Sequence, residues 1–330
     1  MPRALRTWIV LAGLALLVAA TPGAAHGASP RIVGGQQTSL SAYPWQVAVF
    51  LWDGDGYVQA CGGVILDATH VLTAAHCLLD DAGDPYSDPT DVAVLAGVDD
   101  LDAEPLPDEQ FIEADDLEVM GTYGSPVPDA HDAGIVTLAT PLTRNAKVQP
   151  AALPGTGPQA PDLAAGTPLN VSGWGSIDVA GNVYDSLLRA VTVKAVADGG
   201  CGPDFPGEFD AATMLCAIDT GKDSCFGDSG GPLTMTDGLL VGLVSFGPET
   251  CGGADGAGIY TEVPEATINA FARFPGYAPP QNTAAPTVAG TPAVGTPLTC
   301  DPGTWTGGPQ LAYRFEQAVP ERTVARDWSA

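Results

Sequence analysis

A short glycine-rich segment in the second half of the chain has the residue types of a serine nucleophile and its surroundings. It reads Gly227-Asp228-Ser229-Gly230-Gly231-Pro232. A serine hydroxyl is unreactive at its ordinary pKa, so it needs a histidine that takes its proton and backbone N–H groups where negative charge develops. Glycine before the serine lets these N–H groups approach a substrate unobstructed. The segment therefore predicts a hydrolase that uses Ser229.

His76 is the best candidate for the base among the four histidines. His26 lies in a segment that we expect to be removed, His70 sits within an apolar run, and His131 merely precedes a better candidate. His76 follows the β-prone run Val71-Leu72-Thr73-Ala74-Ala75, which would hold an imidazole rigidly at the end of a strand. Because a histidine beside a cysteine is more often structural, the assignment needs a partner carboxylate.

Asp132 is the carboxylate that best fits this role. A carboxylate beside a catalytic histidine fixes the imidazole tautomer and stabilises the imidazolium. Most of the 39 acidic residues must be solvated surface, but Asp132 leads directly into the apolar run Ala133-Gly134-Ile135-Val136-Thr137-Leu138. This context predicts a buried carboxylate.

Five segments together resemble the trypsin family of secreted serine endopeptidases. They are Ile32-Val33-Gly34-Gly35, Thr73-Ala74-Ala75-His76-Cys77, His131-Asp132-Ala133-Gly134-Ile135, Ser172-Gly173-Trp174-Gly175 and the serine segment. They occur in the family's order of histidine, aspartate and serine, and the resemblance covers about residues 32 to 275. It implies a triad of His76, Asp132 and Ser229, with the N–H groups of Gly227 and Ser229 as the oxyanion hole.

The resemblance also implies a primary specificity pocket with Asp223 at its base. Taken alone, Asp223 reads as another surface aspartate, but in such a pocket it would pair with a guanidinium or ammonium group. We therefore expect protein or peptide substrates cleaved after Arg or Lys. The other implied pocket residues are Ser224, Ser245, Phe246, Gly247 and Gly258. The alternatives are a different primary specificity, if Asp223 points away, and a non-catalytic homologue that only binds protein.

The resemblance assigns Asp228 to activation. It would pair with the N-terminal ammonium of Ile32, which is released by cleavage after Arg31. A buried unpaired carboxylate is costly, so we expect a zymogen that matures when this amine forms. Since Arg31 matches the specificity inferred from Asp223, we expect the zymogen to activate itself.

The first residues have the features of a secretory signal peptide. Arg3 and Arg6 precede a 13-residue apolar run, and small residues follow around positions 25–28. The run is too short for a comfortable membrane span, so we expect an extracellular protein with no membrane attachment once the signal is removed. We assign residues 1–28 to the signal and 29–31 to an activation propeptide.

Export to an oxidising compartment predicts paired cysteines. The resemblance implies the disulfides Cys61–Cys77, Cys201–Cys216 and Cys225–Cys251, which leaves Cys300 without a mate. No CxxC pair occurs, so we expect no zinc site on these cysteines and no cofactor. Calcium binding through the loop at 99–109 is the alternative, although solvated acids are the favoured interpretation.

The charge balance bears on partners. The chain has 12 basic and 39 acidic residues, and removal of residues 1–31 takes away three arginines and no acid. Nucleic acid is therefore excluded as a partner. We favour solubility over attraction of cationic substrates as the role of this charge, because the acids cluster in the stretch 99–118, which reads as a surface loop. We expect a monomer that meets protein substrates and protein protease inhibitors.

Short apolar or alternating runs between Gly, Pro and Asp clusters predict an all-β protein. They span 46–51, 63–66, 92–95, 135–138, 169–172, 188–193 and 239–246. Only 265–274 favours a helix, since Ile268 and Phe271 are three residues apart after Pro264. The resemblance implies two six-stranded antiparallel β-barrels over 32–275, with the active site between them and this short helix at the C-terminal end.

The composition changes after residue 275. A Pro-rich linker spans 276–285, and 286–330 resembles the start of an immunoglobulin-like β module. About 45 residues cannot complete a sandwich that needs about 100. We therefore expect an incomplete module or a disordered tail.

Overall fold

The computed structural model describes residues 32–103, 107–252 and 256–273, and the short segments 282–284, 287–290, 299–301 and 304–305. The predicted signal peptide and propeptide, with Arg31, lie outside the described residues. No helix among the described residues has the length and apolar character needed to cross a bilayer.

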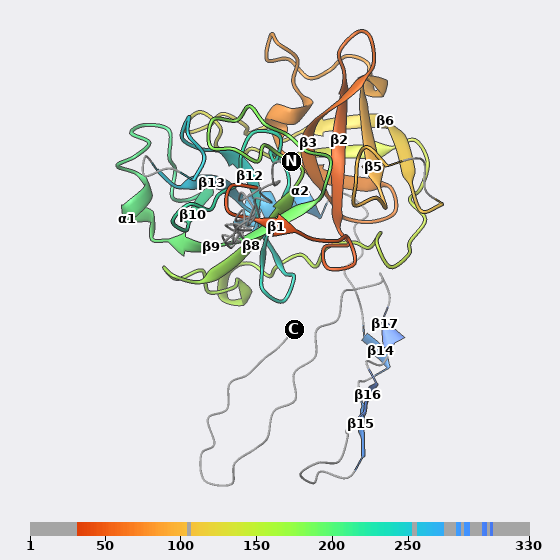
Figure 1. Ribbon diagram of the computed structural model, residues 1–330. Coiled ribbons are helices and arrows are strands. Elements are labelled where there is room, and N and C mark those ends of the chain that lie inside the picture. Colours follow the sequence, from red (N-terminus) through yellow and green to blue (C-terminus); the bar gives the residue numbers. More distant parts are fainter. Residues whose placement is uncertain are drawn as a thin grey trace, which may run out of the picture.

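Six antiparallel strands close the first barrel, which is the orange to yellow half of Figure 1. The strands are β2 (Gln46–Trp52), β3 (Tyr57–Ile65), β4 (His70–Thr73), β5 (Val92–Ala96), β6 (Gln110–Val119) and β7 (Gly134–Leu138). They pair in the order β2-β3-β4-β7-β6-β5. Alternate side chains point inward, so the valines of β2 and β5 pack together inside the barrel.

The second barrel is the green to blue half of the same picture. Its strands are β8 (Pro168–Gly173), β9 (Arg189–Val196), β10 (Met214–Ile218), β11 (Pro232–Met235), β12 (Leu240–Phe246) and β13 (Gly258–Glu262). The order β9-β10-β13-β12-β11-β8 is closed by pairing of β8 with β9, and β1 (Gln36–Gln37) adds to the edge of β9. The prediction of an all-β fold with two six-stranded barrels is confirmed.

The described residues contain few helices, and these are short. The α-helices are α1 (Asp198–Cys201) and α2 (Ala266–Ala272), and the 3-10 turns are η1 (Ala75–Leu78), η2 (Pro89–Asp91) and η3 (Gly157–Gln159). The predicted C-terminal helix is α2. It begins at Ala266 and is capped by Glu265, whose carboxylate accepts hydrogen bonds from the N–H groups of Thr267 and Ile268. Its buried Ile268 then packs into a core shared by both barrels.

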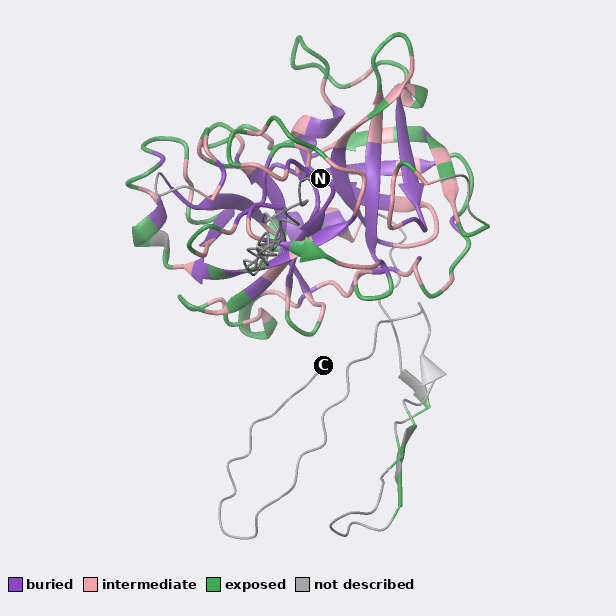
Figure 2. Cartoon of the chain, in the orientation of Figure 1, coloured by how far each residue is buried: buried purple, intermediate pink, exposed green. Residues whose placement is uncertain are grey.

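The two barrels meet through closely packed backbone in the buried centre of the molecule (Figure 2). The Gly62 N–H on β3 donates to the carbonyl of Ser229 at 2.7 Å. A Cβ at Gly62 would lie 2.9 Å from Gly231 Cα, so only glycine permits this approach. Nearby, the Ser172 hydroxyl donates to the buried Gln46 side chain at 2.7 Å. These contacts hold the serine segment against the barrel that bears His76.

The acidic stretch at 99–118 differs from its prediction. Its second half is not a loop, because Gln110 to Val119 form β6, a strand of ten residues. Ala114 is buried, whereas Glu113, Asp115 and Asp116 are exposed. Because one face of a barrel strand meets solvent, carboxylates on that face are compatible with the strand. The many carboxylates of this segment gave it the composition of a surface loop, so its composition did not indicate a strand.

Beyond residue 273 the described strands form two short ladders. They pair β14 (Asn282–Ala284) with β17 (Thr304–Trp305) and β15 (Thr287–Ala289) with β16 (Thr299–Asp301). The rest of the expected linker and module lies outside the described residues. The immunoglobulin-like assignment therefore stays a prediction.

Candidate active site

His76 is held by the turn that follows β4. It lies in η1, and its backbone N–H donates to Asp132 Oδ1 at 3.0 Å. Its ring Nδ1 lies 2.8 Å from the other carboxylate oxygen, Oδ2. The same carboxylate therefore holds both the backbone and the ring of His76, which fixes the direction of the imidazole.

Asp132 is fully buried, as its sequence context predicts. Ser245 on β12 donates its hydroxyl to Oδ2 at 2.6 Å, and Thr261 on β13 donates its hydroxyl to the Asp132 carbonyl at 2.7 Å. Both donors come from the second barrel. The carboxylate thus bridges the two barrels, and Thr261 is a supporting residue that no sequence motif indicated.

The electrostatics of the His76–Asp132 pair favour the charged form of both side chains. Burial on its own would raise the pKa of Asp132, but the charge and hydrogen bonds of His76 outweigh it and leave this pKa below its ordinary value. Burial would lower the pKa of His76, but the charge and hydrogen bond of Asp132 outweigh burial and raise it above 6.5. The pair therefore stabilises an imidazolium, as a general base requires.

The raised His76 pKa yields a prediction for the pH dependence of activity. In its expected role of general base, His76 must be neutral before it can take a proton, so kcat/KM should rise with pH to a midpoint above the ordinary 6.5, not at it. Hydrolysis of a neutral amide substrate from pH 5 to 9 measures this midpoint. A midpoint below 6.5 would contradict the stabilised imidazolium.

Ser229 stands in a tight turn between two glycines with positive φ. Gly227 and Gly230 have φ of +89° and +73°, a region that favours glycine. A Cβ at Gly230 would lie 2.1 Å from Thr73 Oγ1, and the Gly230 N–H donates to Val244 at 2.7 Å. The N–H groups of Gly227 and Ser229 donate no hydrogen bond to another described residue. They are therefore available to an oxyanion.

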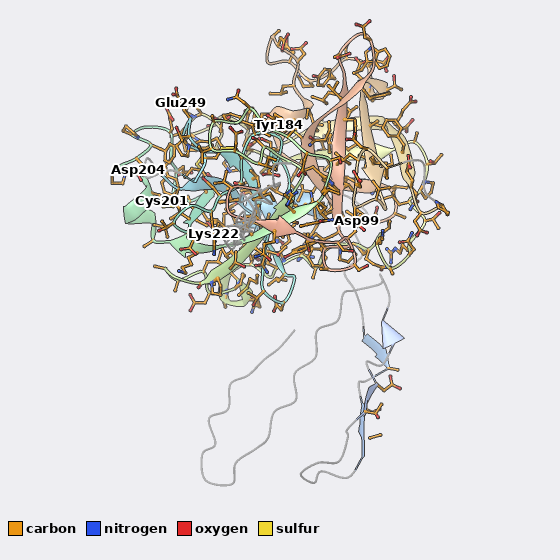
Figure 3. All side chains as sticks on the ribbon, viewed as in Figure 1. Asp99, Tyr184, Cys201, Asp204, Lys222 and Glu249 are labelled. Atoms are coloured by element: carbon orange, nitrogen blue, oxygen red, sulfur yellow. A yellow bond between two sulfur atoms is a disulfide. The ribbon has the colours of Figure 1, made fainter. Side chains whose placement is uncertain are left out.

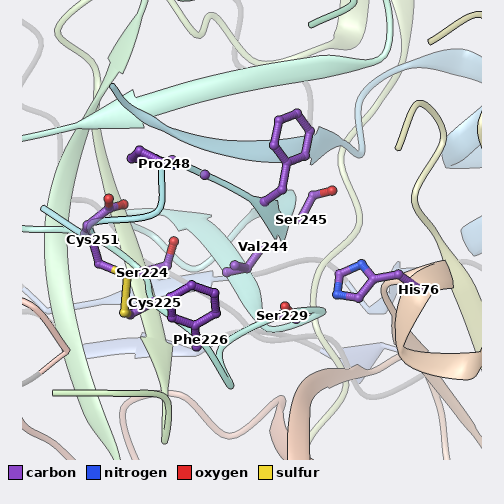
Figure 4. A pocket seen from close by; sticks show the side chains of 13 residues that line it. His76, Ser224, Cys225, Phe226, Ser229, Val244, Ser245, Pro248 and Cys251 are labelled. Carbon is purple, nitrogen blue, oxygen red and sulfur yellow. A yellow bond between two sulfur atoms is a disulfide. The ribbon is translucent and has the colours of Figure 1, made fainter. Parts of the chain in front are cut away.

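A pocket of about 270 Å³ lies beside Ser229 and His76 (Figure 4). The figure shows the His76 ring pointing toward Ser229 at one end of this pocket. The structure brings all the residues predicted for the substrate pocket into its wall. They are Asp223, Ser224, Ser245, Phe246, Gly247 and Gly258.

Asp223 has an incomplete set of partners inside this pocket. It is 1% exposed, and its Oδ2 accepts from the Gly252 N–H at 3.0 Å, whereas Oδ1 is buried without a hydrogen bond. Burial raises its pKa to about 6. A Cβ at Gly258 would lie 2.7 Å from Oδ1, so glycine leaves this oxygen open. A buried acceptor without a donor is an unfavourable group that a cation in the pocket would satisfy.

Asp228 occupies a second buried position behind the serine turn. Its two oxygens accept from the N–H groups of Gly175 at 2.8 Å and Cys225 at 2.9 Å. Burial nevertheless raises its pKa to about 7. A Cβ at Gly175 would lie 2.5 Å from the carboxylate carbon, so this glycine is needed for the approach. Ile32 is also fully buried and has φ of +38°, which is unfavourable for a β-branched residue.

Gln59 is a residue that sequence reasoning missed. Its side-chain N–H group on β3 donates to the carbonyl of Gly227 at 2.9 Å and to that of Cys61 at 3.0 Å. Gln59 therefore anchors the serine turn to the first barrel. No motif could have indicated it, because its partner is 168 residues away.

Replacement of Gln59 should test this anchoring. Gln59→Leu keeps the side-chain volume but removes the donor, and a hydrogen bond of this kind is worth about 1 kcal/mol. We expect kcat to fall about fivefold with little change in KM, because the loosened Gly227 serves the transition state. Gln59→Asn, which keeps a shorter amide, is the matched comparison. An unchanged kcat for Gln59→Leu would contradict the anchoring role.

Metal-binding candidates are few. Among the described residues, the group with donor atoms close enough to share an ion is Cys61, His76 and Cys77. The two sulfurs are joined in a disulfide, so the group lacks thiolate ligands.

The described part also contains the disulfides Cys201–Cys216 and Cys225–Cys251, as the resemblance implies. In the candidate calcium loop, the Asp99 carboxylate accepts from the Leu40 N–H and pairs with Lys147 at 2.9 Å.

Comparison with known proteins identifies the family. A family model described as Trypsin matches residues 32–269. Kallikrein-12 of Homo sapiens is 34% identical over 244 residues, which cover 73% of this chain and 90% of that protein. Trypsin of Sus scrofa is 32% identical over 235 residues, covering 71% and 91%. A solved structure of neuropsin, described as a serine protease expressed in the limbic system of mouse brain, has a TM-score of 0.59 at 28% identity and covers 72% of this chain and 97% of its own. The chain therefore belongs to the trypsin family of serine proteases.

Proposed function

We propose that this chain is a secreted endopeptidase that cleaves polypeptides after Arg or Lys. Ser229 is the nucleophile, His76 the general base and Asp132 the residue that orients it. The pairing of His76 with the buried Asp132 at 2.8 Å supports these roles, as does the pocket that His76 and Ser229 share.

The reaction would follow the acyl-enzyme route of the family. As Ser229 Oγ attacks the scissile carbonyl, its proton passes to His76 Nε2, and the carbonyl oxygen becomes an oxyanion held by the N–H groups of Gly227 and Ser229. The intermediate collapses when His76 gives that proton to the leaving amine, which breaks the peptide bond. Water then attacks the acyl-enzyme by the same steps and restores Ser229.

The observation that carries the specificity is the unpartnered Oδ1 of Asp223 in the pocket wall. An Arg or Lys side chain entering the pocket would bring N–H donors to this oxygen and a positive charge to the buried carboxylate. Its charge would also lower the raised pKa of Asp223, so that the carboxylate ionises when substrate binds.

Three matched chromogenic amides test this function. The three substrates differ only in having Arg, Lys or Phe before the scissile bond. The mature chain should cleave the Arg and Lys substrates much faster than the Phe substrate. Preference for Phe would instead assign a different primary specificity. Titration with a serine-directed phosphonate distinguishes a non-catalytic binding homologue, which would not be labelled at Ser229 and would cleave none of the three.

We further propose that cleavage after Arg31 activates the chain. The new ammonium of Ile32 would neutralise Asp228, whose pKa of about 7 reflects burial without a cation. The unfavourable φ of Ile32 supports the same idea, because cutting the bond to Arg31 frees this backbone to relax. In a purified Ser229→Ala variant the bond between Arg31 and Ile32 should stay intact. Cutting of that variant would mean that another protease performs the activation.

The raised Asp228 pKa predicts that stability depends on cleavage. In the folded, uncut chain the pKa of Asp228 is about 7, which lies above the value of 3.8 in the unfolded chain. The stability that Asp228 contributes is therefore fully present below pH 3.8 and is lost as the pH rises through 7. Uncut Ser229→Ala protein should therefore lose up to ~4 kcal/mol of unfolding free energy from pH 4 to 8 relative to protein cut after Arg31. Denaturant unfolding of both forms measures the difference. Equal pH profiles would contradict pairing with the new ammonium.

A further inference from the structure

The large apolar side chains that are exposed in the described residues gather in two groups. One group lies on the β2–β3 hairpin and on β6, and comprises Trp52, Val58 and Phe111. The other lies in the loop between β8 and β9 and beside the serine turn, and comprises Val179, Val183, Tyr184 and Phe226. Exposed apolar side chains are normally scattered singly, so their gathering indicates a binding surface.

Trp52 and Phe111 of the first group belong to a continuous row of aromatic rings, which we call the aromatic row: Phe50, Trp52, Tyr57 and Phe111. Trp52 and Tyr57 face each other across β2 and β3, with ring centres 5.3 Å apart. Tyr57 lies 5.2 Å from Phe111, which lies 5.7 Å from Phe50. All three contacts are edge to face, a favourable arrangement that leaves ring surface open to a partner.

A pocket of about 420 Å³, here called the leaving-side pocket, joins the aromatic row to the second group. Phe50 of the row and Tyr184 of the loop both line it, together with Gln59 and Asp102. Tyr184 is labelled in Figure 3 near the junction of the two barrels. The pocket therefore connects the aromatic row, through Phe50, with Tyr184 of the β8–β9 loop.

The leaving-side pocket borders the serine turn. A Cβ at Gly227 would lie 3.4 Å from the Tyr184 ring and 3.7 Å from Gln59 Oε1, and both of these residues line the pocket. It shares no lining residue with the pocket that contains Asp223. The leaving-side pocket therefore lies against the serine turn but apart from the Asp223 pocket, so a substrate whose Arg or Lys fills the Asp223 pocket leaves it open to another part of the same polypeptide.

The charges around this surface are negative. Asp102 and Asp185, which also pairs with Arg189, line the pocket, and the Tyr57 hydroxyl lies 3.2 Å from Glu113. Burial, followed by the nearby carboxylates of Glu113 and the η2 turn, raises the pKa of Tyr57. No Lys or Arg is among the residues that line the pocket. Aromatic faces beside carboxylates are suited to the apolar stem and charged head of Lys or Arg.

We propose that the leaving-side pocket and the aromatic row bind a basic segment of the polypeptide substrate, on the C-terminal side of the scissile bond. This rests on the proposed function, because it needs cleavage at Ser229. A cationic side chain would lie against Phe50 and Tyr184 with its charge toward Asp102. The formal charge of −27 makes a second copy of the chain a poorer occupant than a basic segment.

Matched peptides test the proposal. Two fluorogenic peptides share one Arg cleavage site and differ only in Arg-Arg or Gln-Gln at the second and third residues after it; a short Arg amide with no such residues is the reference. The mature chain should cleave the Arg-Arg peptide with about tenfold higher kcat/KM, since two cation–π contacts each contribute about 0.5–1 kcal/mol. Equal rates for the two peptides would overturn the proposal.

Surface variants assign the preference to these residues. Phe111→Ser and Asp102→Asn should each reduce the tenfold preference to about threefold or less and leave hydrolysis of the short amide unchanged. Asp237→Asn, which removes an exposed carboxylate in the β11–β12 turn, is the control and should keep the full preference. A preference that survives both test variants would overturn the proposal. So would self-association in sedimentation that Phe111→Ser abolishes, because the occupant would then be a second copy. If neither the amide nor either peptide is cut, the proposed function fails, and this inference with it.

Discussion

Replacement of Asp132 by asparagine is expected to lower kcat about 10⁴-fold while leaving the fold intact. Both carboxylate oxygens accept hydrogen bonds, Oδ1 from the His76 backbone and Oδ2 from the His76 ring and Ser245. An asparagine has one acceptor oxygen, and keeping it on the His76 backbone turns its NH2 group toward the ring. The ring must then carry its proton on Nε2, where it can no longer accept the proton of Ser229.

Steady-state kinetics on an Arg amide, with thermal unfolding alongside, measure this effect. Ser245→Ala is the matched control, because it removes one hydrogen bond to the same oxygen without changing the tautomer. We expect that control to lose about tenfold in kcat, as for a single bond to a charged group. If Asp132→Asn keeps a kcat similar to that of Ser245→Ala, then Asp132 does not set the tautomer of His76.

Replacement of Asp223 by serine is expected to lower kcat/KM for an Arg substrate about 10³-fold. The variant would leave the substrate guanidinium buried without its carboxylate, and loss of one partner from a buried pair costs about 3–5 kcal/mol. Hydrolysis of the Phe amide should fall far less, because that side chain has no charge to neutralise. The ratio of the Arg and Phe rates is therefore the quantity to measure.

A second measurement on the same variant separates specificity from damage to the fold. The Asp223 pKa of about 6 exceeds its unfolded value of 3.8, so wild-type protein loses the associated stability as pH rises through 6. At pH 8, Asp223→Ser should be more stable than wild type by up to ~3 kcal/mol, and at pH 4 it should have no such advantage. Gly258→Ala, which narrows the pocket beside Oδ1, should lose Arg cleavage without this gain. A destabilised Asp223→Ser at pH 8 would contradict the idea that this carboxylate is held at a cost for substrate binding.

Residues close in sequence were the ones that sequence reasoning identified well. The strand at Gly134–Leu138 and the helix at Ala266–Ala272 were predicted from local apolar patterns. The spacing of apolar residues along a strand or a helix indicates which of its faces is buried. Asp132 was predicted to be buried from its position before such a strand, and it is. By contrast, β6 was missed because its exposed carboxylates obscured the pattern.

Contacts between distant segments were beyond local patterns. Gln59 and Thr261 act on Gly227 and Asp132 across the boundary between the barrels, and neither stands in a motif. The aromatic row was equally hidden, because Tyr57 and Phe111 meet only when β3 and β6 curve around the same barrel. Barrel closure depends on the pairing of whole strands, so single residue spacings do not report it.

The amino-acid sequence by itself determined the chemical groups of the site and the elements that bear them, since residue type and local periodicity are properties of neighbouring residues. Only the tertiary structure decided which of those groups meet. It joined His76 to Asp132, left one oxygen of Asp223 unpartnered in a pocket, and brought Tyr184 and Phe50 together beside Gly227. These outcomes depend on how two closed barrels pack against each other, because burial and hydrogen bonding are set by residues from both.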